Sequence, residues 1–473
     1  MRPFLVALVS LVFLAGSFSG CLSGDEPQAK EDPKARLRRG ASVINLNASL
    51  LDTAQFAADE RFGPDRPLTQ QDIPGLLPKA LTNYNITLAY VLNMSLYPNI
   101  KAYQIGETLT GRAIFGLLMT DDGEFHPERP SIMFTCSQHG NEPSGSEACL
   151  IFIEYFTHGT DKLAQDVRAK LNIVINPLAN PDGKESNRRG NYDQVDINRD
   201  HMNLATLEGR AIHAAYNLFN PIIGLDLHEF GGAGAPPPVD PPAVTTRQTF
   251  QIAGPEGVAD DDRGLFVSTN ELLRHVFTRS SEKFKYGSTG YYTGSTSAGA
   301  FPSVHRHHMA LRNSYSLLFE TGGGGGVTNL PLRVDHHVTG SFAVIEWLFT
   351  NQARAEQTVK DADRAAATRA PGVQGWLIPP QANTPKAEHF LTMHGVNFTK
   401  LDKDTTYPNV QDYKAGSVPV PSQRSFPNGT ILVNRWQADG ILINELFENT
   451  EDTYYTKGPR SWPLDAYRIL QFS

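Results

Sequence analysis

The stretch Cys136-Ser137-Gln138-His139-Gly140-Asn141-Glu142-Pro143 decides the expected fold of this chain of 473 residues. An apolar run, residues 131–136, leads into it and predicts a buried strand, and the proline that ends it suits the first turn of a helix. His139 and Glu142 lie between the two elements, on a loop that Gly140 allows to turn tightly. A histidine and a carboxylate placed in this way suit Zn²⁺, which takes nitrogen and oxygen ligands at about 2.0–2.2 Å. Taken alone, such a pair is more often a surface loop with a chance charge contact than a metal site.

Three further segments share this form, an apolar run that ends in polar side chains. They are residues 171–177 followed by Asn180-Pro181-Asp182-Gly183, residues 222–229 with His228 near the end, and residues 315–321 with Glu320 near the end. In open α/β sheets, ligands bind beyond the carboxyl ends of the strands. We therefore expect the polar ends of these four predicted strands to form one shared site.

Composition and charge narrow the class of protein. Hydrophobic residues make up 40% of the chain and charged residues 19%, which is ordinary for a soluble globular protein. The formal net charge of -8 gives no reason to expect a nucleic-acid partner.

The first twenty residues have the pattern of a secretion signal. A short positive start is followed by an apolar run to Gly16 that is too short to span a bilayer comfortably. Cys21 comes directly after Phe18-Ser19-Gly20, which resembles the lipobox of bacterial and archaeal lipoproteins. We expect a lipid anchor at Cys21, the only expected contact with a membrane, or else plain cleavage near Gly20. Either outcome predicts an extracytoplasmic protein, secreted or membrane-anchored.

Changes in composition divide the rest of the chain. Residues 1–20 are the expected signal peptide, and residues 21–83 the expected tether and N-terminal segment. The catalytic domain is expected over residues 84–368. A Pro-Gly pair at 371–372 marks the boundary of a small α/β domain, residues 369–473, in which the sequence shows no chemistry.

The motifs together resemble those of the zinc metallocarboxypeptidases of the carboxypeptidase A type. The resemblance covers roughly residues 84–350. The residues that carry it are Ile105-Gly106, Gly111-Arg112, His139-Gly140-Asn141-Glu142, Asn180-Pro181-Asp182-Gly183, Arg189, Asp196-Ile197-Asn198-Arg199, Asp226-Leu227-His228 and Phe319-Glu320-Thr321. It implies an α/β fold with a mixed central sheet flanked by helices, to which the small C-terminal α/β domain is added. It also implies a peptide substrate, whereas the sequence does not indicate the oligomeric state.

The resemblance also implies a role for each motif residue. His139, Glu142 and His228 would hold one Zn²⁺ per chain, with one position open for water. Glu320 would be the general base. Arg189 would stabilise the oxyanion, although Arg188 is an alternative. Asp196 would orient a zinc-binding histidine through its far ring nitrogen.

The remaining implied contacts are to the substrate. Asn198 and Arg199 match the pair that grips the terminal carboxylate, because a guanidinium fork fits a carboxylate at two points. Tyr292 is a candidate for the tyrosine that covers the substrate, and an ordinary core or surface tyrosine is the alternative. Two departures from the family are Asn141, which stands where digestive members carry arginine, and Asp200, which stands where many members carry asparagine.

Three other features leave alternatives open. Asp226 either orients a group at the end of the sheet or is structural. The run His305-Arg306-His307-His308 is either a pocket for polar side chains or a structural cluster. Cys136 and Cys149 lie on adjacent predicted elements, and we expect two buried free thiols rather than a disulfide.

Three functions compete at this point. The first is an exported zinc metallocarboxypeptidase, a hydrolase of C-terminal peptide bonds. The second is a zinc-dependent deacylase or amidase acting on N-acyl amino acids or cell-wall peptides, because His-Gly-Asn-Glu and Asp-X-Asn-Arg also occur in that branch. The third is an inactive, surface-anchored binding protein. Asn180-Pro181-Asp182-Gly183 and the size of the domain favour the first, and the presence of every ligand and the base disfavours the third.

Overall fold

The structure is a computed structural model. It describes residues 82–230, 250–253, 264–284, 289–290, 302–322, 330–368, 372–381, 384–412, 421–448 and 466–471. All of them belong to one compact unit, residues 36–473. The predicted signal peptide, the tether, Cys21 and Tyr292 lie outside the described residues.

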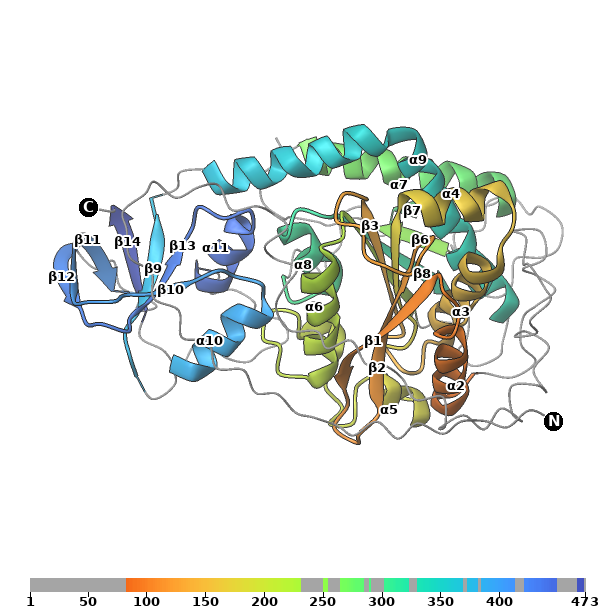
Figure 1. The fold of residues 1–473 in the computed structure, drawn as a ribbon, viewed down its shortest axis with the longest axis horizontal. Helices are drawn as coiled ribbons and strands as arrows, with labels where there is room; N and C mark the ends of the chain where they lie inside the picture. Colours follow the sequence, from red (N-terminus) through yellow and green to blue (C-terminus); the bar gives the residue numbers. More distant parts are fainter. Residues whose placement is uncertain are drawn as a thin grey trace. The chain divides into compact units, whose positions relative to one another are not determined.

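A mixed sheet of eight strands forms the larger part of the fold, in the order β1-β2-β4-β3-β5-β8-β6-β7 (Figure 1). Its strands are β1 (Ile100–Glu107), β2 (Ala113–Met119), β3 (Ser131–Cys136), β4 (Asn172–Asn176), β5 (Ile223–Phe230), β6 (Phe250–Ala253), β7 (Thr289–Gly290) and β8 (Tyr315–Gly322). The four central strands β4, β3, β5 and β8 are parallel. Antiparallel pairs join β1 to β2, β2 to β4 and β6 to β8, and β7 runs parallel to β6. Every residue of β3 is buried, as expected for a strand covered on both faces.

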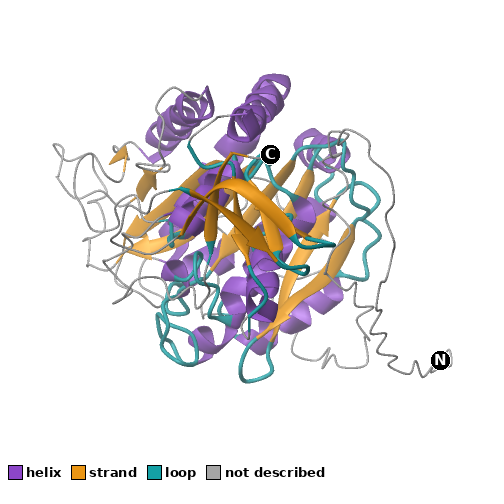
Figure 2. Ribbon diagram, turned by 90° about the vertical axis from the view of Figure 1, so that its left-hand side faces the viewer, coloured by secondary structure: helices purple, strands orange, loops and turns teal. Residues whose placement is uncertain are grey.

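Helices cover both faces of this sheet (Figure 2). They are α2 (Tyr84–Met94), α3 (Pro143–His158), α4 (Lys162–Lys170), α5 (Pro181–Glu185), the 3₁₀ turn η5 (Ile197–Arg199), α6 (Leu207–Phe219), α7 (Gly264–Phe284), α8 (His305–Leu311) and α9 (Leu330–Thr368). Successive residues of β3 belong to different cores: Phe134 packs in the core that includes α3 and α9, and Met133 in the core that includes α6. This alternation follows from the pleat of the strand.

A second, antiparallel sheet has the order β10-β13-β9-β14-β11-β12. Its strands are β9 (Gly375–Ile378), β10 (Thr399–Lys400), β11 (Thr405–Asp412), β12 (Ser422–Phe426), β13 (Ile431–Asn434) and β14 (Tyr467–Gln471), and its helices are α10 (Thr384–Met393) and α11 (Gly440–Glu448). Trp376 of β9 stacks on Phe447 of α11, with 4.7 Å between ring centroids. The predicted fold class, a mixed sheet flanked by helices with a small C-terminal α/β domain, is confirmed, while its exact boundary stays a prediction.

Hydrogen bonds join the segments that carry the two sheets. Asn217 of α6 donates to the carbonyl of Met393 at the end of α10, at 2.8 Å. Asn313, after α8, donates to the carbonyl of Ala438 at 2.8 Å. Both are partly buried, and hydrogen bonds of this kind contribute about 0.5–1.5 kcal/mol each.

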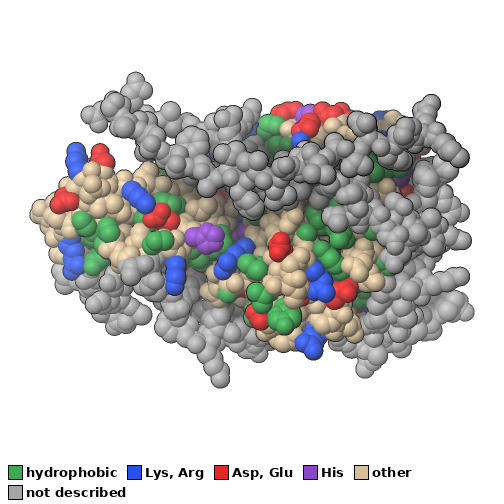
Figure 3. Space-filling model, turned by 60° about the horizontal axis from the view of Figure 1, so that its bottom comes forward, with side chains coloured by type: hydrophobic (Ala, Val, Ile, Leu, Met, Phe, Trp, Pro, Cys, Tyr) green, Lys and Arg blue, Asp and Glu red, His purple; other side chains and the backbone are tan. Residues whose placement is uncertain are grey.

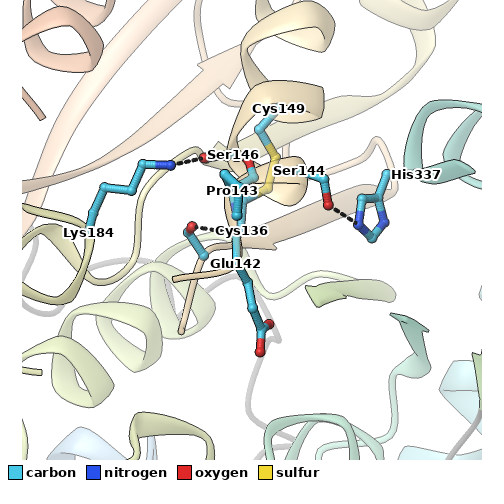
Figure 4. Close-up of a disulfide and its surroundings, with 9 residues drawn as sticks. Cys136, Glu142, Pro143, Ser144, Ser146, Cys149, Lys184 and His337 are labelled. Atoms are coloured by element: carbon cyan, nitrogen blue, oxygen red, sulfur yellow. Dashed lines mark hydrogen bonds between the residues drawn. A yellow bond between two sulfur atoms is a disulfide. The ribbon is translucent and has the colours of Figure 1, made fainter. Parts of the chain in front are cut away.

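Cys136 and Cys149 form a disulfide, so the prediction of two free thiols is wrong (Figure 4). Cys136 ends β3, and Cys149 lies in the second turn of α3, the next element of the chain. The helix turns Cys149 back over the end of the strand and brings the two Cα atoms within 6.8 Å. Glu142 points away from the disulfide, so the bond braces the loop from behind.

The described surface carries charges of both signs. On the face shown in Figure 3, described basic and acidic side chains are interspersed rather than gathered into a patch of one sign. Among the helices that the structure describes, none combines the length and the apolar character needed to span a membrane.

Candidate metal centre

The site lies at the carboxyl ends of the central parallel strands. His139 and Glu142 occupy the loop between β3 and α3, and His228 lies near the end of β5. Glu320 lies on β8 directly beside His228, because the two residues are partners in the register of the parallel pair. The shared edge that the sequence predicts is therefore present.

Three side chains converge closely enough to hold one metal ion. His139 Nδ1 lies 2.7 Å from Glu142 Oε1, and His228 Nδ1 lies 3.0 Å from His139 Nδ1 and 2.9 Å from Glu142 Oε2. The exposed fractions are 3% for His139, 6% for Glu142 and 1% for His228. Two imidazole nitrogens and a carboxylate turned towards one point, inside the protein, are a donor set that suits Zn²⁺. We call these three residues the mixed cluster.

A carboxylate lies behind each of the two histidines. His139 Nε2 lies 3.1 Å from Asp196 Oδ1, and His228 Nε2 lies 2.9 Å from Asp226 Oδ1. Each carboxylate thus accepts the far N–H of its imidazole and leaves Nδ1 turned towards the metal point, a pairing typical of zinc sites. Of the two alternatives for Asp226, the structure favours the orienting one.

The neighbouring charges shift the pKa values of these groups. Burial works to raise the pKa of Asp196, but the hydrogen bond and charge of His139 and the charges of Arg189 and Arg199 outweigh it and hold the pKa below its usual range. Burial works to lower the pKa of His228, but Asp226 outweighs it and raises that pKa. The carboxylates around the histidines therefore stay ionised and attract a cation.

Glu320 differs from the carboxylates that hold the histidines. Its Oε2 is buried and has no hydrogen-bond partner among the described residues. Burial raises the pKa of Glu320 to about 7, with the charge of Glu142 adding to the effect while that of His228 opposes it. A buried carboxyl group with an uncommitted oxygen and a pKa near neutrality can both accept and release a proton.

Arg189 borders the same point from the side of solvent. Its Nε donates to Asp196 Oδ2 at 3.0 Å, and its Nη1 lies 3.4 Å from Glu142 Oε1. Its side chain is 48% exposed, so the guanidinium sits where a bound molecule can reach it. Of the two candidate arginines, the structure thus brings Arg189 to the site.

The predicted substrate-binding residues lie in and beside η5. Asn198 is 5% exposed, its Oδ1 accepts from the backbone N–H of His305 at 2.9 Å, and its Nδ2 lies 3.1 Å from His228 Nε2. Arg199 donates from Nη1 to the carbonyl of Asn198 at 2.7 Å. Asn198 therefore also packs against a metal ligand, a contact that the sequence did not indicate.

The motif Asn180-Pro181-Asp182-Gly183 supports the loop that carries the ligands. Asn180 Nδ2 donates to the carbonyl of Gln138 at 3.0 Å. Gly140 lies so close to the motif that a Cβ atom there would stand 1.9 Å from the carbonyl carbon of Gly183. No other residue fits at Gly140 unless one of the two loops moves.

The sequence analysis missed a buried polar layer behind the mixed cluster. Gln138 donates from Nε2 to Asp226 at 2.6 Å and lies 3.1 Å from His305 Nδ1, while its Oε1 lies 2.8 Å from His201 Nε2. His201, Gln138 and His305 are each at most 1% exposed. His305 is thus a buried structural residue, the second of the two alternatives for its segment. Only the position of Gln138 next to His139 hinted at a role.

Comparison with known proteins agrees with this class of site. Residues 88–218 match the family model described as zinc carboxypeptidase. This match lies within the part of the chain, roughly residues 84–350, over which the motifs resemble that family. That segment includes His139, Glu142 and η5 but ends before His228 and Glu320, whose placement beside them comes from the structure.

The chain is similar to several individual carboxypeptidases over part of its length. It is 36% identical over 92 residues to carboxypeptidase 2 of Trichophyton rubrum, which is 20% of this chain and 17% of that protein. It is 32% identical over 116 residues to carboxypeptidase D of Mus musculus, which is 22% of this chain and 8% of that protein. The chain thus spans less than a fifth of the length of either relative.

The chain is also similar to solved structures at low sequence identity. A metallo-carboxypeptidase from Burkholderia cenocepacia has 15% identity and a TM-score of 0.45, covering 56% of this chain and 69% of that one. Carboxypeptidase A from Helicoverpa armigera has 15% identity and a TM-score of 0.45, covering 62% of this chain and 79% of that one.

Proposed function

We propose that this protein is an exported zinc metallocarboxypeptidase that removes residues from the carboxyl terminus of peptides. The observation that carries the proposal is the convergence of His139, Glu142 and His228 with Glu320 in register beside His228. Zinc, when bound by the mixed cluster, supplies a Lewis acid that polarises a carbonyl group and lowers the pKa of a water molecule towards about 7.

Glu320 is the proposed general base. Its uncommitted Oε2 accepts a proton from the attacking water and then passes that proton to the nitrogen of the leaving amine. A strand position fixes the carboxyl group more tightly than a loop would. The Oε2 atom itself is buried, which shields it from bulk water that would compete for the same proton.

Arg189 is the proposed group that opposes the negative charge growing on the carbonyl oxygen. Asp196 holds its guanidinium at 3.0 Å, so the cation is placed before the substrate arrives. A preorganised donor of this kind lowers the activation barrier by a few kcal/mol, about 2.7–4 kcal/mol in measured cases.

Arg199 and Asn198 are the proposed partners of the substrate's terminal carboxylate. Arg199 offers a planar fork of N–H donors that matches a carboxylate at two points. Asn198 keeps its Oδ1 on the backbone N–H of His305, and its Nδ2 lies 3.1 Å from His228 Nε2, so its contribution to the substrate is the second N–H of that amide nitrogen. Tyr292, outside the described residues, stays a proposed cover over the substrate.

Export is supported by two independent features. Residues 1–20 have the charge and apolar pattern of a signal peptide, with Cys21 next to them as a proposed lipid attachment site. Cys136 and Cys149 form a disulfide, and such bonds persist mainly outside the cytosol.

A cleavage profile over a library of unblocked and N-blocked peptides, followed by mass spectrometry, tests this function. We expect single residues to be lost from the carboxyl terminus and amidated termini to resist. N-acyl aspartate and N-acyl glutamate are the matched control substrates. Cleavage of these small amides without trimming of peptides would identify a deacylase instead, and turnover of neither class by zinc-loaded protein would contradict both.

A further inference from the structure

Three buried histidines from distant segments meet on the far side of the polar layer. His213 belongs to α6, His308 to α8, and His394 follows the last turn of α10. The ring centroids of His213 and His308 are 4.5 Å apart, and each lies 5.3 Å from that of His394. One ligand atom from each lies within 4.8 Å of the other two. We call them the three-histidine cluster.

The hydrogen bonding of these rings is incomplete. Among the described residues, no partner exists for His213 Nδ1 or for either ring nitrogen of His308. The exposed fractions are 2% for both side chains, so bulk water does not reach them. A buried polar atom without a partner costs about 1–3 kcal/mol. A neutral imidazole has one nitrogen with a lone pair and one N–H, so each of these two rings can offer one lone pair to a ligand.

Two rings of the cluster, those of His394 and His213, have a polar neighbour at Nε2. His394 Nε2 lies 3.3 Å from the carbonyl of Met202, and His213 Nε2 lies 3.2 Å from His201 Nδ1. Metal-bound histidines usually have such a contact on their far nitrogen, because it fixes both the tautomer and the orientation of the ring.

We propose that His213, His308 and His394 bind one Zn²⁺ ion in a second site that is structural rather than catalytic. Three imidazoles without a thiolate suit Zn²⁺ and neighbouring divalent transition metals, and they exclude Mg²⁺ and Ca²⁺, which take oxygen ligands. The three ligand atoms lie within 4.8 Å of one another, and a zinc ion at about 2.0–2.1 Å from each would draw the rings closer together.

The charge around the cluster permits such an ion. Burial lowers the pKa of His213 and of His308, which keeps the neutral form that binds metals. The charge of Arg312 acts on His213 and His308 and opposes a metal. Arg312 Nε lies 4.0 Å from Asp439 Oδ1, however, and its Nη1 donates to Asn217 Oδ1 at 2.6 Å. Its charge is therefore partly offset.

The site would join two parts of the fold. His213 and His308 belong to helices that cover the eight-stranded sheet, whereas His394 belongs to the segment that carries the second sheet. The hydrogen bond from Asn217 to Met393 already joins α6 to α10 at this place. An ion bound by all three rings would lock that contact, because metal-binding free energy adds to folding free energy.

Metal counting on the full chain tests the proposal. The protein is saturated with zinc chloride, freed of excess metal, and measured by inductively coupled plasma mass spectrometry. We expect two zinc ions per chain in the native protein, one in His308→Gln, one in His139→Ala, and none in the double variant. A native count of one that falls to zero in His139→Ala would overturn the second site and leave the peptidase proposal intact.

A second measurement covers the case in which His308→Gln does not fold. Crystals of the zinc-loaded native protein are measured above and below the zinc absorption edge. An anomalous peak between the rings of His213, His308 and His394 is the expected result. A peak at the mixed cluster alone would show that the three rings pack without metal, and the proposal would then be wrong.

Discussion

The mixed cluster and the three-histidine cluster differ in their donors and in their access to solvent. The mixed cluster includes a carboxylate and borders Arg189, whose side chain is 48% exposed. The three-histidine cluster holds imidazoles only, and its residues are at most 2% exposed. Each cluster supplies three ligands, so burial rather than the number of ligands distinguishes them, and a substrate does not reach the three-histidine cluster. This difference supports a catalytic role for the mixed cluster and a structural role, joining two parts of the fold, for the three-histidine cluster.

The two clusters are nevertheless connected through the polar layer. Gln138 contacts Asp226, which holds His228, and it also contacts His201, which lies 3.2 Å from His213. Packed hydrogen-bonded groups of this kind can couple two sites energetically. A substitution at the mixed cluster therefore tests two things, its effect on activity and whether metal binding at the three-histidine cluster changes with it.

The replacement Glu320→Gln should have the largest effect. It keeps the size of the side chain but removes the proton acceptor, so kcat should fall by about 10²–10⁴-fold. Zinc content should stay at the native value, because Glu320 is not one of the three ligands. Steady-state kinetics and metal analysis on the same preparation check both points. Unchanged kcat would remove Glu320 from the mechanism.

The replacement Arg189→Met should rank second, with Arg188→Met as the matched control. Loss of the guanidinium beside Glu142 should lower kcat by about 10²–10³-fold, with a smaller change in KM, because the cation opposes charge that grows in the transition state. The control should stay within about twofold of the native rate, a change of at most ~0.4 kcal/mol in the barrier. The reverse ranking would transfer the role to Arg188.

The replacement Asp226→Asn should come third and separates the two clusters directly. Asp226 accepts from His228 Nε2, and losing that contact should weaken zinc binding at the mixed cluster by about 10–100-fold. The three-histidine cluster should keep its ion, because Asp226 contacts none of its three rings and is linked to it only indirectly, through Gln138, His201 and His305. Competition with a chelator should therefore release one zinc ion early and one late. Simultaneous release of both would show that the clusters act as one unit.

The sequence predicts the mixed cluster because its ligands end strands or follow them closely. His139 and Glu142 are three positions apart, and His228 and Glu320 end apolar runs. Because ligands bind beyond the carboxyl ends of strands in open α/β sheets, this pattern is enough to predict that the four residues lie together. The three-histidine cluster has no such signal. His213 and His308 lie within helices, and His394 lies far along the chain, so only the packing of α6, α8 and α10 brings them together.

The prediction of free thiols at Cys136 and Cys149 is wrong for a similar reason, because the disulfide also depends on tertiary packing. The sequence places Cys136 and Cys149 on adjacent elements, but it does not fix the rotation of α3 about its axis. That rotation is set by the packing of α3 against β5 and α9, in which Gly145 lies against the backbone of Leu227. Tertiary packing, which no local pattern encodes, therefore decides which face of the helix carries Cys149 over the strand.

The pH profile gives the smallest expected effect and tests which cluster controls activity. Burial raises the pKa of Glu320 to about 7 in the metal-free site, and the positive charge of a bound zinc ion favours the carboxylate and lowers that pKa again. Because the base must be ionised to accept a proton, kcat/KM should fall tenfold per pH unit on the acid side. The midpoint should lie between the ordinary glutamate pKa of about 4.3 and 7.

Two variants show whether this acid limb belongs to Glu320. Residual activity of Glu320→Gln should lack the limb, whereas His308→Gln should keep it with the same midpoint, because the three-histidine cluster holds no group that takes part in proton transfer. A midpoint that shifts in His308→Gln would mean that the polar layer carries charge between the clusters. The three-histidine cluster would then influence proton transfer, and it could not be called purely structural even if both ions were present.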